Sequence, residues 1–243
     1  MSADPLAPLL SLEGVPSAYV AARDAVDVVL RDRGLRRTSP ETTSESLLRG
    51  AHASAVLAGS EATLAQVRSG EVEDRHVLAA LRVSTALLSL APLLRSTPLQ
   101  ALARIHALAG AGEVPEERLG RPRDEEAATR LRGLAQLLTA TTRAPALVVA
   151  AVVHAELATL GPFGSHDGIV ARAAERLVLV ARGVDEKSLV VPEAGHLAMR
   201  AEYQQALLGY RDGGQAGVHA WLLHCARAYA AAAEASPLRR AAD

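Results

Sequence analysis

The sequence is poor in cysteine, in aromatic residues and in net charge. Its single cysteine, Cys225, cannot form an internal disulfide, which fits a reducing compartment and predicts a buried structural thiol. Aromatic residues make up 2% of the chain, so the core must be built mainly from Ala, Leu and Val. The net charge is −1, and we interpret the one short basic run, Arg31–Arg37, as a solvated helix end. The composition therefore argues against a nucleic-acid partner.

Membrane and export signals are also lacking. The chain opens MSADPLAPLLSLEG, without the cationic start and long apolar run of a secretory signal. The most apolar stretch, residues 144–161, is interrupted by His154 and Glu156, which favours a buried helix over a membrane span. We therefore expect a cytoplasmic protein that does not use a membrane as a partner.

What the sequence does have is helical periodicity along almost its whole length. Ser39 with Pro40, and Thr97 with Pro98, are typical helix starts, and Gly59 and Gly110 are typical stops. There is no internal repeat and no convincing strand, so we predict an all-α fold. The division expected is an N-terminal helical extension (1–44), a helical domain (45–235) and a flexible tail (236–243). The predicted helices span 18–34, 38–59, 73–94, 97–110, 125–140, 144–160, 168–183, 196–213 and 217–235, with a charged loop at 111–126.

One stretch, AAVVHAELATLGPFGSHDGIVAR, carries a family likeness. It resembles the signature of the Fic (Fido) family, a helix bearing a His followed by IHPFxxGNGRxxR. The likeness extends to LARIHALAG and LGRPR upstream and to an R-x-x-Y-x-x-x-L pattern with a later Trp downstream, and it runs from roughly residue 45 to residue 235. The matching positions are His154, Leu157, Leu160, Pro162, Phe163, Gly168, Arg172, Arg200, Tyr203, Leu207 and Trp221.

The resemblance implies a Fic-fold helical bundle around a central motif helix pair. It also implies transfer of AMP from ATP to a hydroxyl group of a target protein. In the family, the motif His is the general base, a carboxylate helps to hold magnesium, and two arginines bind phosphates. The Gly-rich turn and the following helix N-terminus present N–H groups to those phosphates.

Several positions of this sequence depart from that pattern. Gly161 stands where the motif His is expected, and glycine has no side chain that could accept a proton. Ser165 replaces the magnesium carboxylate, and Ile169 replaces the first arginine. His166 and Asp167 replace the first Gly and the Asn of the turn. We therefore expect ATP and magnesium binding to be weakened and AMP transfer to be absent, with no certain cofactor.

Two further departures point the same way. Many Fic proteins carry an inhibitory [S/T]xxxE[G/N] segment, and here Ser54 and Gly59 fit that frame while Ala58 stands in place of the Glu. The family also places a β-hairpin flap after the element that LGRPR resembles. Arg123 is followed almost at once by a helical pattern, so we expect the flap to be short or absent and target docking by strand pairing to be impaired.

The candidate cofactor-binding residues are Phe163, Ser165, Asp167, Gly168 and Arg172, and His166 is a candidate relocated general base. Structural roles without catalysis are alternatives. His166 would then be solvated or cap a helix, His154 would be structural, and Asp167 would cap a helix starting near Gly168. A metal site formed by His154, His166 and His196 is conceivable, but no short-spaced ligand pair favours it, and we predict no metal.

Two functions follow as expectations. The first is a pseudoenzyme that binds a protein partner or associates with itself. The second is an active nucleotidyl- or phospho-transferase in which the divergent loop uses His166 as base.

Overall fold

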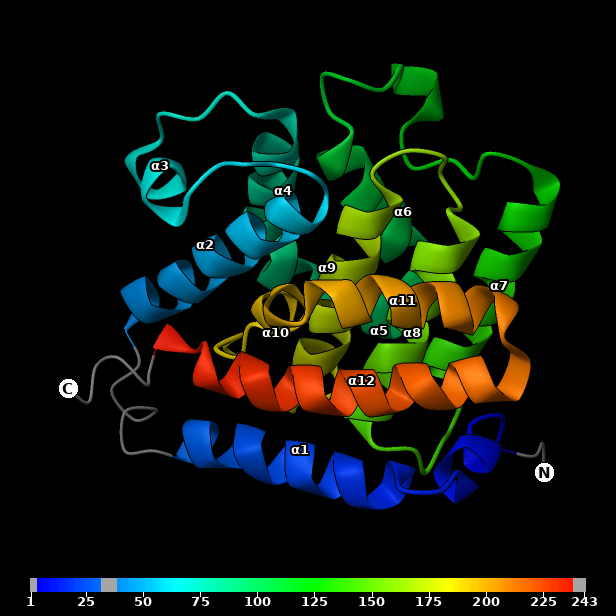
Figure 1. The fold of residues 1–243 in the computed structure, drawn as a ribbon. Helices are drawn as coiled ribbons and strands as arrows, with labels where there is room; N and C mark the ends of the chain where they lie inside the picture. Colours follow the sequence, from blue (N-terminus) through cyan, green and yellow to red (C-terminus); the bar gives the residue numbers. More distant parts are fainter. Residues whose placement is uncertain (1–3, 32–38, 238–243) are drawn as a thin grey trace.

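The computed structural model describes residues 4–31 and 39–237, and every regular element in that part of the chain is a helix (Figure 1). The predicted all-α class is therefore confirmed. Most of the basic run and of the tail, residues 32–38 and 238–243, lie outside the described residues. The α-helices are α1 (Val15–Arg31), α2 (Pro40–Leu57), α3 (Leu64–Ser69), α4 (Arg75–Ala86), α5 (Ala91–Ser96), α6 (Pro98–Ala109), α7 (Glu125–Thr139), α8 (Ala146–Leu160), α9 (Asp167–Ala181), α10 (Pro192–Ala198), α11 (Arg200–Asp212) and α12 (Gly214–Glu234). Short 3₁₀ turns lie at Ala7–Ser11, Leu87–Leu90 and Glu116–Arg118.

The centre of the molecule is the helix pair α8 and α9, joined by the loop 161–166. Helix α8 is apolar and buried from Leu147 to Ala155, as expected for a helix at the centre of the molecule, and only its first residue and its last turn are partly exposed. Helix α9 is buried from Ile169 to Ala181 although it carries three charged residues within that span. The long helix α12 crosses this pair, with α1 on one side of it and α11 on the other (Figure 1).

The predicted N-terminal extension shares this core. Helix α1 packs along α12 through a buried face that includes Val15, Tyr19 and Val26, and the rings of Tyr19 and Tyr229 lie 6.4 Å apart. The boundary expected at 44/45 falls inside α2, because that helix starts at the Ser39–Pro40 signal. At the other end Ser236 is fully buried, so the chain is still packed where the tail was expected to begin.

Two predicted helices are divided in the structure. The stretch 73–94 contains α4, a 3₁₀ turn and the start of α5, with Pro92 in the first turn of α5, where its missing N–H costs nothing. The stretch 196–213 breaks at Met199, whose φ of −120° and ψ of 39° are not helical. Taken whole, Arg75–Ser96 is long and apolar enough to cross a membrane, and its inner residues, including Val77 and Leu87, are buried in the protein core.

Candidate functional site

The loop 161–166 between α8 and α9 is shaped by three residues with positive φ. Gly161 ends α8 in the left-handed conformation (φ 56°), Gly164 has φ 75°, and His166 precedes α9 with φ 55°. Phe163 anchors the loop: its buried ring stacks on His106 with centroids 4.4 Å apart and planes 6° from parallel. Phe163 therefore positions the loop by packing into the core.

Arg123 occupies the surroundings of Gly161, where the family resemblance places the catalytic His. Its guanidinium donates to the carbonyl oxygens of Leu160 and Gly161, and its backbone N–H donates to Pro162 O at 2.8 Å. A Cβ atom built on Gly161 would lie 3.4 Å from Arg123 Nη1 and 3.5 Å from an oxygen of Asp167. The space beside Gly161 is thus bordered by a cation and a carboxyl group.

Asp167 has a different role from the helix cap that was expected. Helix α9 begins at Asp167 itself, and the carboxylate turns back into the loop to accept the Phe163 N–H at 2.9 Å. Burial raises the pKa of this carboxyl to about 6, and the hydrogen bonds from the N–H groups of Phe163 and Gly164 only partly offset that effect. The side chain therefore holds the loop together, and the first turn of α9 has no side-chain cap.

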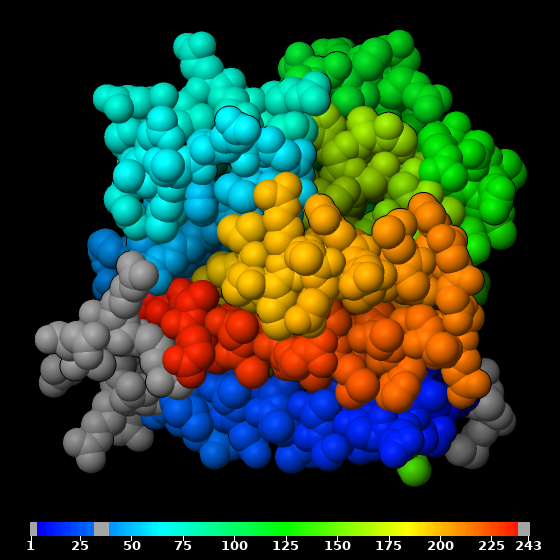
Figure 2. Space-filling view, in the orientation of Figure 1, coloured from blue at the N-terminus to red at the C-terminus, as the bar shows by residue number. Residues whose placement is uncertain are grey.

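A pocket of about 410 Å³ opens beside this uncapped end of α9; we call it the loop pocket. Figure 2 shows the yellow-green residues of the α8–α9 region reaching the surface between the cyan residues of α3 and α4 and the orange residues of α11. Ala58 lies on the wall where the inhibitory Glu of the family pattern is expected, so the wall carries no carboxylate there. The pocket is lined by Leu57, Ala58, Arg75, His76, Glu113, Ser165, His166, Asp167, Gly168, Ile169 and Arg172.

His166 lies in the wall of the loop pocket with its side chain only 10% exposed. Its Nε2 lies 3.5 Å from Glu113 Oε2, whereas its Nδ1 is buried without a hydrogen-bond partner. Burial lowers the pKa of the imidazole, with the Glu113 charge opposing that effect, so the ring is neutral at pH 7. With the proton on Nε2 toward Glu113, the Nδ1 lone pair remains free.

Ser165 is oriented by His106. The Nδ1 of His106 accepts the Gly120 N–H at 2.9 Å, and burial lowers the pKa of this ring to about 4. The neutral ring therefore carries its proton on Nε2, which lies 3.1 Å from Ser165 Oγ and donates to it. In this tautomer His106 cannot activate the hydroxyl as a base. The Ser165 proton remains available for donation, which suits an anion better than a magnesium ion.

Arg172, the one motif arginine left, is buried (3% exposed) and already has acceptors. Its Nε and Nη2 donate to the side chain and the carbonyl of Ser54, each at 2.9 Å, and its Nη1 donates to Tyr203 Oη at 3.3 Å. The expected phosphate clamp therefore ties α9 to α2 and α11. Ser54 supplies the link to α2.

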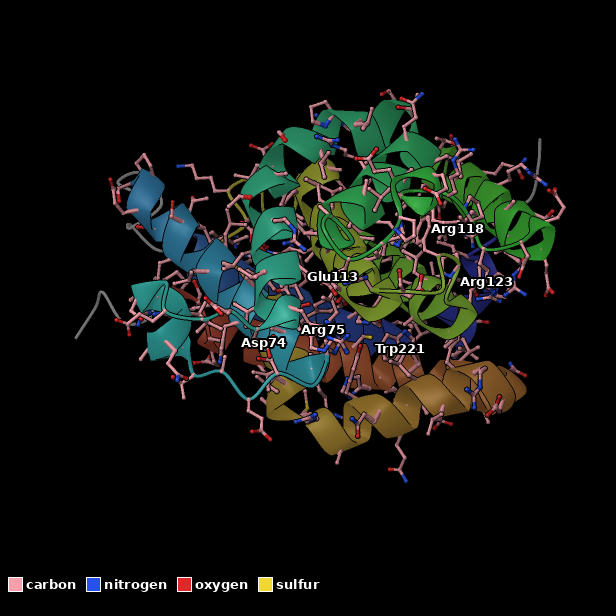
Figure 3. All side chains as sticks on the ribbon, turned by 90° about the horizontal axis from the view of Figure 1, so that it is seen from above. Asp74, Arg75, Glu113, Arg118, Arg123 and Trp221 are labelled. Carbon is pink, nitrogen blue, oxygen red and sulfur yellow. The ribbon has the colours of Figure 1, made fainter. Side chains whose placement is uncertain are left out.

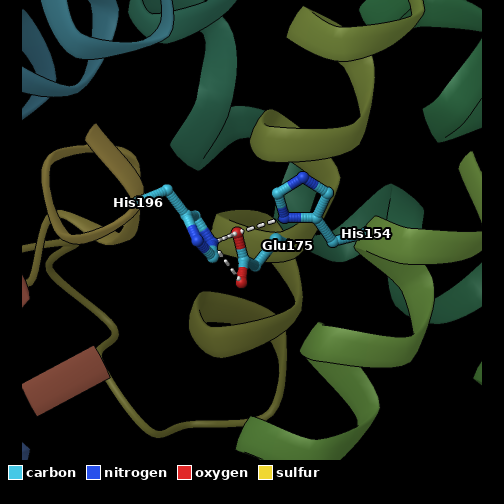
Figure 4. Close-up of side chains that lie close together, drawn as sticks. All are labelled: His154, Glu175 and His196. Carbon is cyan, nitrogen blue, oxygen red and sulfur yellow. Dashed lines mark hydrogen bonds and ion pairs between the residues drawn. The ribbon is translucent and has the colours of Figure 1, made fainter. Parts of the chain in front are cut away.

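A second polar cluster lies deeper, where His154 and His196 meet at Glu175 (Figure 4). His154 Nδ1 is 2.8 Å and His196 Nε2 is 3.0 Å from Glu175 Oε2, and all three side chains are fully buried. His166 is not part of this cluster, which corrects the triad considered from the sequence. Glu175 was missed because a charged residue within an apolar helix shows no local sign of its partners.

The distances in this cluster are those of hydrogen bonds. A tetrahedral metal with bonds of 2.0–2.1 Å separates its ligand atoms by about 3.3 Å, wider than the contacts to Glu175. Tyr229 Oη donates to Glu175 Oε1 at 2.8 Å, and Tyr203 Oη lies 3.0 Å from the remaining nitrogen of His154. Burial opposes ionisation of Glu175, but His196 and His154 together lower the pKa of the carboxyl below its ordinary range. Hydrogen bonds from His154, His196 and Tyr229 therefore already engage the carboxylate oxygens of Glu175 that would be the ligands of a metal.

The comparisons with known proteins agree with this architecture. No family model and no curated protein matches the chain. Among solved structures, it is similar to a Fic family protein from Desulfovibrio desulfuricans G20, with a TM-score of 0.79, 18% identity, and coverage of 96% of this chain and 75% of that one. It is also similar to a fragment of Fic-1 from C. elegans, with a TM-score of 0.71, 18% identity, and coverage of 97% and 74%. For a single-substitution variant of that fragment the TM-score is 0.70 and the identity 19%, with coverage of 94% of this chain and 73% of that one.

The protein therefore has the Fic fold: a helical bundle built around the motif helix pair α8 and α9, as the sequence resemblance predicted.

Proposed function

We propose that this Fic-fold protein does not transfer AMP and acts instead as a pseudoenzyme that binds a protein partner. The observation that carries the proposal is the environment of Gly161. General-base catalysis needs a lone pair within hydrogen-bond reach of the target hydroxyl. At this position the chain offers a glycine flanked by Arg123, a permanent cation that cannot accept a proton, and by Asp167, whose carboxylate is engaged by the Phe163 N–H.

The rest of the nucleotide machinery supports the same proposal. Ser165 brings no charge to a magnesium ion and is engaged by His106. Ile169 is 3% exposed and offers no phosphate contact, and the guanidinium of Arg172 is used by Ser54 and Tyr203. In the described chain no hairpin lies between Arg123 and α7, because the helix begins at once. Asp124 caps α7 by accepting the Ala127 N–H at 2.7 Å. These residues do not fit an ATP–magnesium complex.

The test is incubation of the purified protein with labelled ATP, magnesium and a cell lysate. We expect no label on any protein above the level of a sample without the chain. Protein-bound label that disappears in His166→Ala would overturn the proposal and establish His166 as a base. Label that persists in that variant would contradict both interpretations of the site.

The partner is tested separately. Light scattering after size-exclusion chromatography measures self-association over a range of concentrations. Co-purification of the chain with an intact Fic enzyme from the same cell tests whether the protein partner is such an enzyme. A monomer that captures no Fic enzyme and no other protein would remove the binding half of the proposal.

A second candidate function rests on one specific observation: His166 lines the loop pocket, and its buried Nδ1 has no hydrogen-bond partner. Glu113 at 3.5 Å from Nε2 orients the neutral ring so that Nδ1 could accept a proton from a bound hydroxyl. This function predicts turnover of a phosphorylated ligand other than ATP, with a rate that falls on removing His166. A ligand that binds the pocket but is recovered unchanged would exclude it.

A further inference from the structure

A second pocket, of about 390 Å³, lies between α1 and the start of α8; we call it the α1 pocket. Figure 1 shows α1 along the lower edge of the bundle, whereas the loop 161–166 lies in its upper part. No residue lines both this pocket and the loop pocket. The α1 pocket is therefore separate from the positions that match the Fic pattern.

The interior of the α1 pocket is apolar. Apart from three charged residues, its lining consists of aliphatic, proline and tyrosine side chains, among them Val15, Tyr19 and Val20 of α1 and Pro145, Leu147 and Val148 at the start of α8. Val20 is 62% exposed, the largest fraction among the large apolar side chains exposed in the described chain. A concave, mostly apolar space of this volume is typical of small-molecule sites, and a ligand that covers Val20 would remove apolar surface from water.

The three charged residues that line the pocket are Arg23, Asp24 and Arg143. Arg23 is already paired, since its Nε lies 2.8 Å from Asp27 Oδ1 on the next turn of α1. Asp24 is exposed, and its carboxylate has no hydrogen bond or ion pair with any described residue. Asp24 therefore offers the pocket an unpaired negative charge.

Arg143 offers an unpaired positive charge. Its backbone N–H donates to Asp4 Oδ2 at 2.8 Å, and the same carboxyl group accepts the Thr142 hydroxyl at 2.9 Å and the Leu6 N–H at 3.0 Å. The backbone N–H of Arg143 is the largest cause that lowers the pKa of Asp4, and the Arg143 charge is the smallest. Asp4 thus holds Arg143 chiefly by its backbone, and the exposed guanidinium makes no hydrogen bond within the described part of the chain.

We propose that the α1 pocket binds a free α-amino acid with a large apolar side chain. Arg143 receives the carboxylate, Asp24 receives the ammonium group, and the apolar interior receives the side chain. Both groups of an amino acid are charged at pH 7, so a zwitterion leaves neither unpaired charge unmatched. A simple anion would face Asp24, and a simple amine would face Arg143.

This site goes beyond the proposed function and does not depend on it. Helix α1 packs mainly on α12, and its contacts with α8 are few. A bound amino acid would touch both α1 and α8, and it would therefore strengthen the attachment of α1 to the motif helix pair.

The experiment measures binding of L-leucine and L-phenylalanine to the full chain at pH 7 by calorimetry and thermal shift. Matched analogues lack one charge each: 4-methylpentanoate and 3-phenylpropanoate lack the ammonium group, and 3-methylbutylamine and 2-phenylethylamine lack the carboxylate. Both amino acids should raise the melting temperature, because they bind only the folded state. Each analogue should bind about fivefold more weakly, the scale of an exposed ion pair. Serine, which cannot fill the apolar interior, should not bind.

Each of two variants should remove one preference. Arg143→Ala should bind leucine no more tightly than 3-methylbutylamine, and Asp24→Asn should bind leucine no more tightly than 4-methylpentanoate. Both residues are exposed, so neither substitution disturbs the core. Arg118→Ala is the control and should keep both preferences; Figure 3, seen from above, shows Arg118 in front of the dark blue α1 and the other lower helices.

Equal binding of leucine and its two analogues by the parent protein would overturn the proposal and indicate a site for any small apolar compound. No thermal shift and no heat of binding with either amino acid at about 10 mM would overturn it as well. So would Arg143→Ala and Asp24→Asn that keep the preferences of Arg118→Ala. None of these results bears on AMP transfer, which the incubation with labelled ATP tests separately.

Discussion

Replacing Asp167 with asparagine should stabilise the protein at neutral pH and leave its stability almost unchanged in acid. The carboxyl is partly buried, and burial raises its pKa from 3.8 to about 6. A group whose pKa is raised in the folded state contributes stability below its unfolded pKa, and that contribution is lost as the pH rises through the folded pKa. The asparagine side chain would have no charge to bury and could still accept the Phe163 N–H through its amide oxygen.

The magnitude follows from the same pKa difference. The gap between 3.8 and about 6 corresponds to about 3 kcal/mol, at 1.36 kcal/mol per pKa unit. Solvent screening of a partly exposed side chain reduces this to about 1.5 kcal/mol. For a chain of this size we expect Asp167→Asn to raise the melting temperature by about 3–6 °C at pH 8. The gain should shrink through pH 6 and vanish below pH 4.

The assay is urea denaturation of both proteins at several pH values, with the difference in unfolding free energy as the readout. Taking the difference cancels the titration of groups common to both proteins. Asp24→Asn, an exposed aspartate on α1, controls for the loss of one negative charge. A difference that is constant with pH, or a variant less stable than the parent at pH 8, would refute the account of Asp167.

Three other substitutions test the packing around the site. Glu175→Ala should destabilise the fold by about 3–5 kcal/mol, because it leaves buried donors without an acceptor; circular dichroism during urea unfolding measures this. Gly195→Ala would place a Cβ atom 2.0 Å from Ala228 O, so a loss of about 1–3 kcal/mol or more is expected in the same assay. Gly161→His should not restore AMP transfer from labelled ATP, because Arg123 and the left-handed backbone remain; labelled protein would contradict this.

The sequence predicted the elements whose signals are local. The starts of α2 and α6 were marked by Ser39–Pro40 and Thr97–Pro98, and α8 was marked as the most apolar stretch of the chain. Cys225 was predicted to be buried and is. These signals depend on residues within one or two turns of each other, so no knowledge of the tertiary structure is needed to interpret them.

The interactions that decide the site are not local and could not be predicted. Arg123 reaches Gly161 across 38 positions, and Arg172 reaches Ser54 across 118. The role of Asp167 is set by a local contact that the helix-capping pattern did not indicate: its sequence position fits a helix cap, yet its carboxylate accepts the N–H of Phe163, four residues earlier in the turn. The spacing of Arg172, Glu175 and Arg176 places them along one side of α9, which was the only available sign that this side is polar and buried.

Three of the positions that still match the family pattern have a packing role in this structure. Phe163 stacks on His106, and Arg172 joins α9 to α2 and α11. A Cβ atom on Gly168 would lie 3.2 Å from Arg172 Nη1, so this glycine leaves room for that arginine. Gly161 and Ile169, where the pattern is lost, are positions at which the family needs a base and a phosphate ligand. Packing alone is therefore sufficient to retain the outline of the loop, and the match at those positions is no argument for AMP transfer.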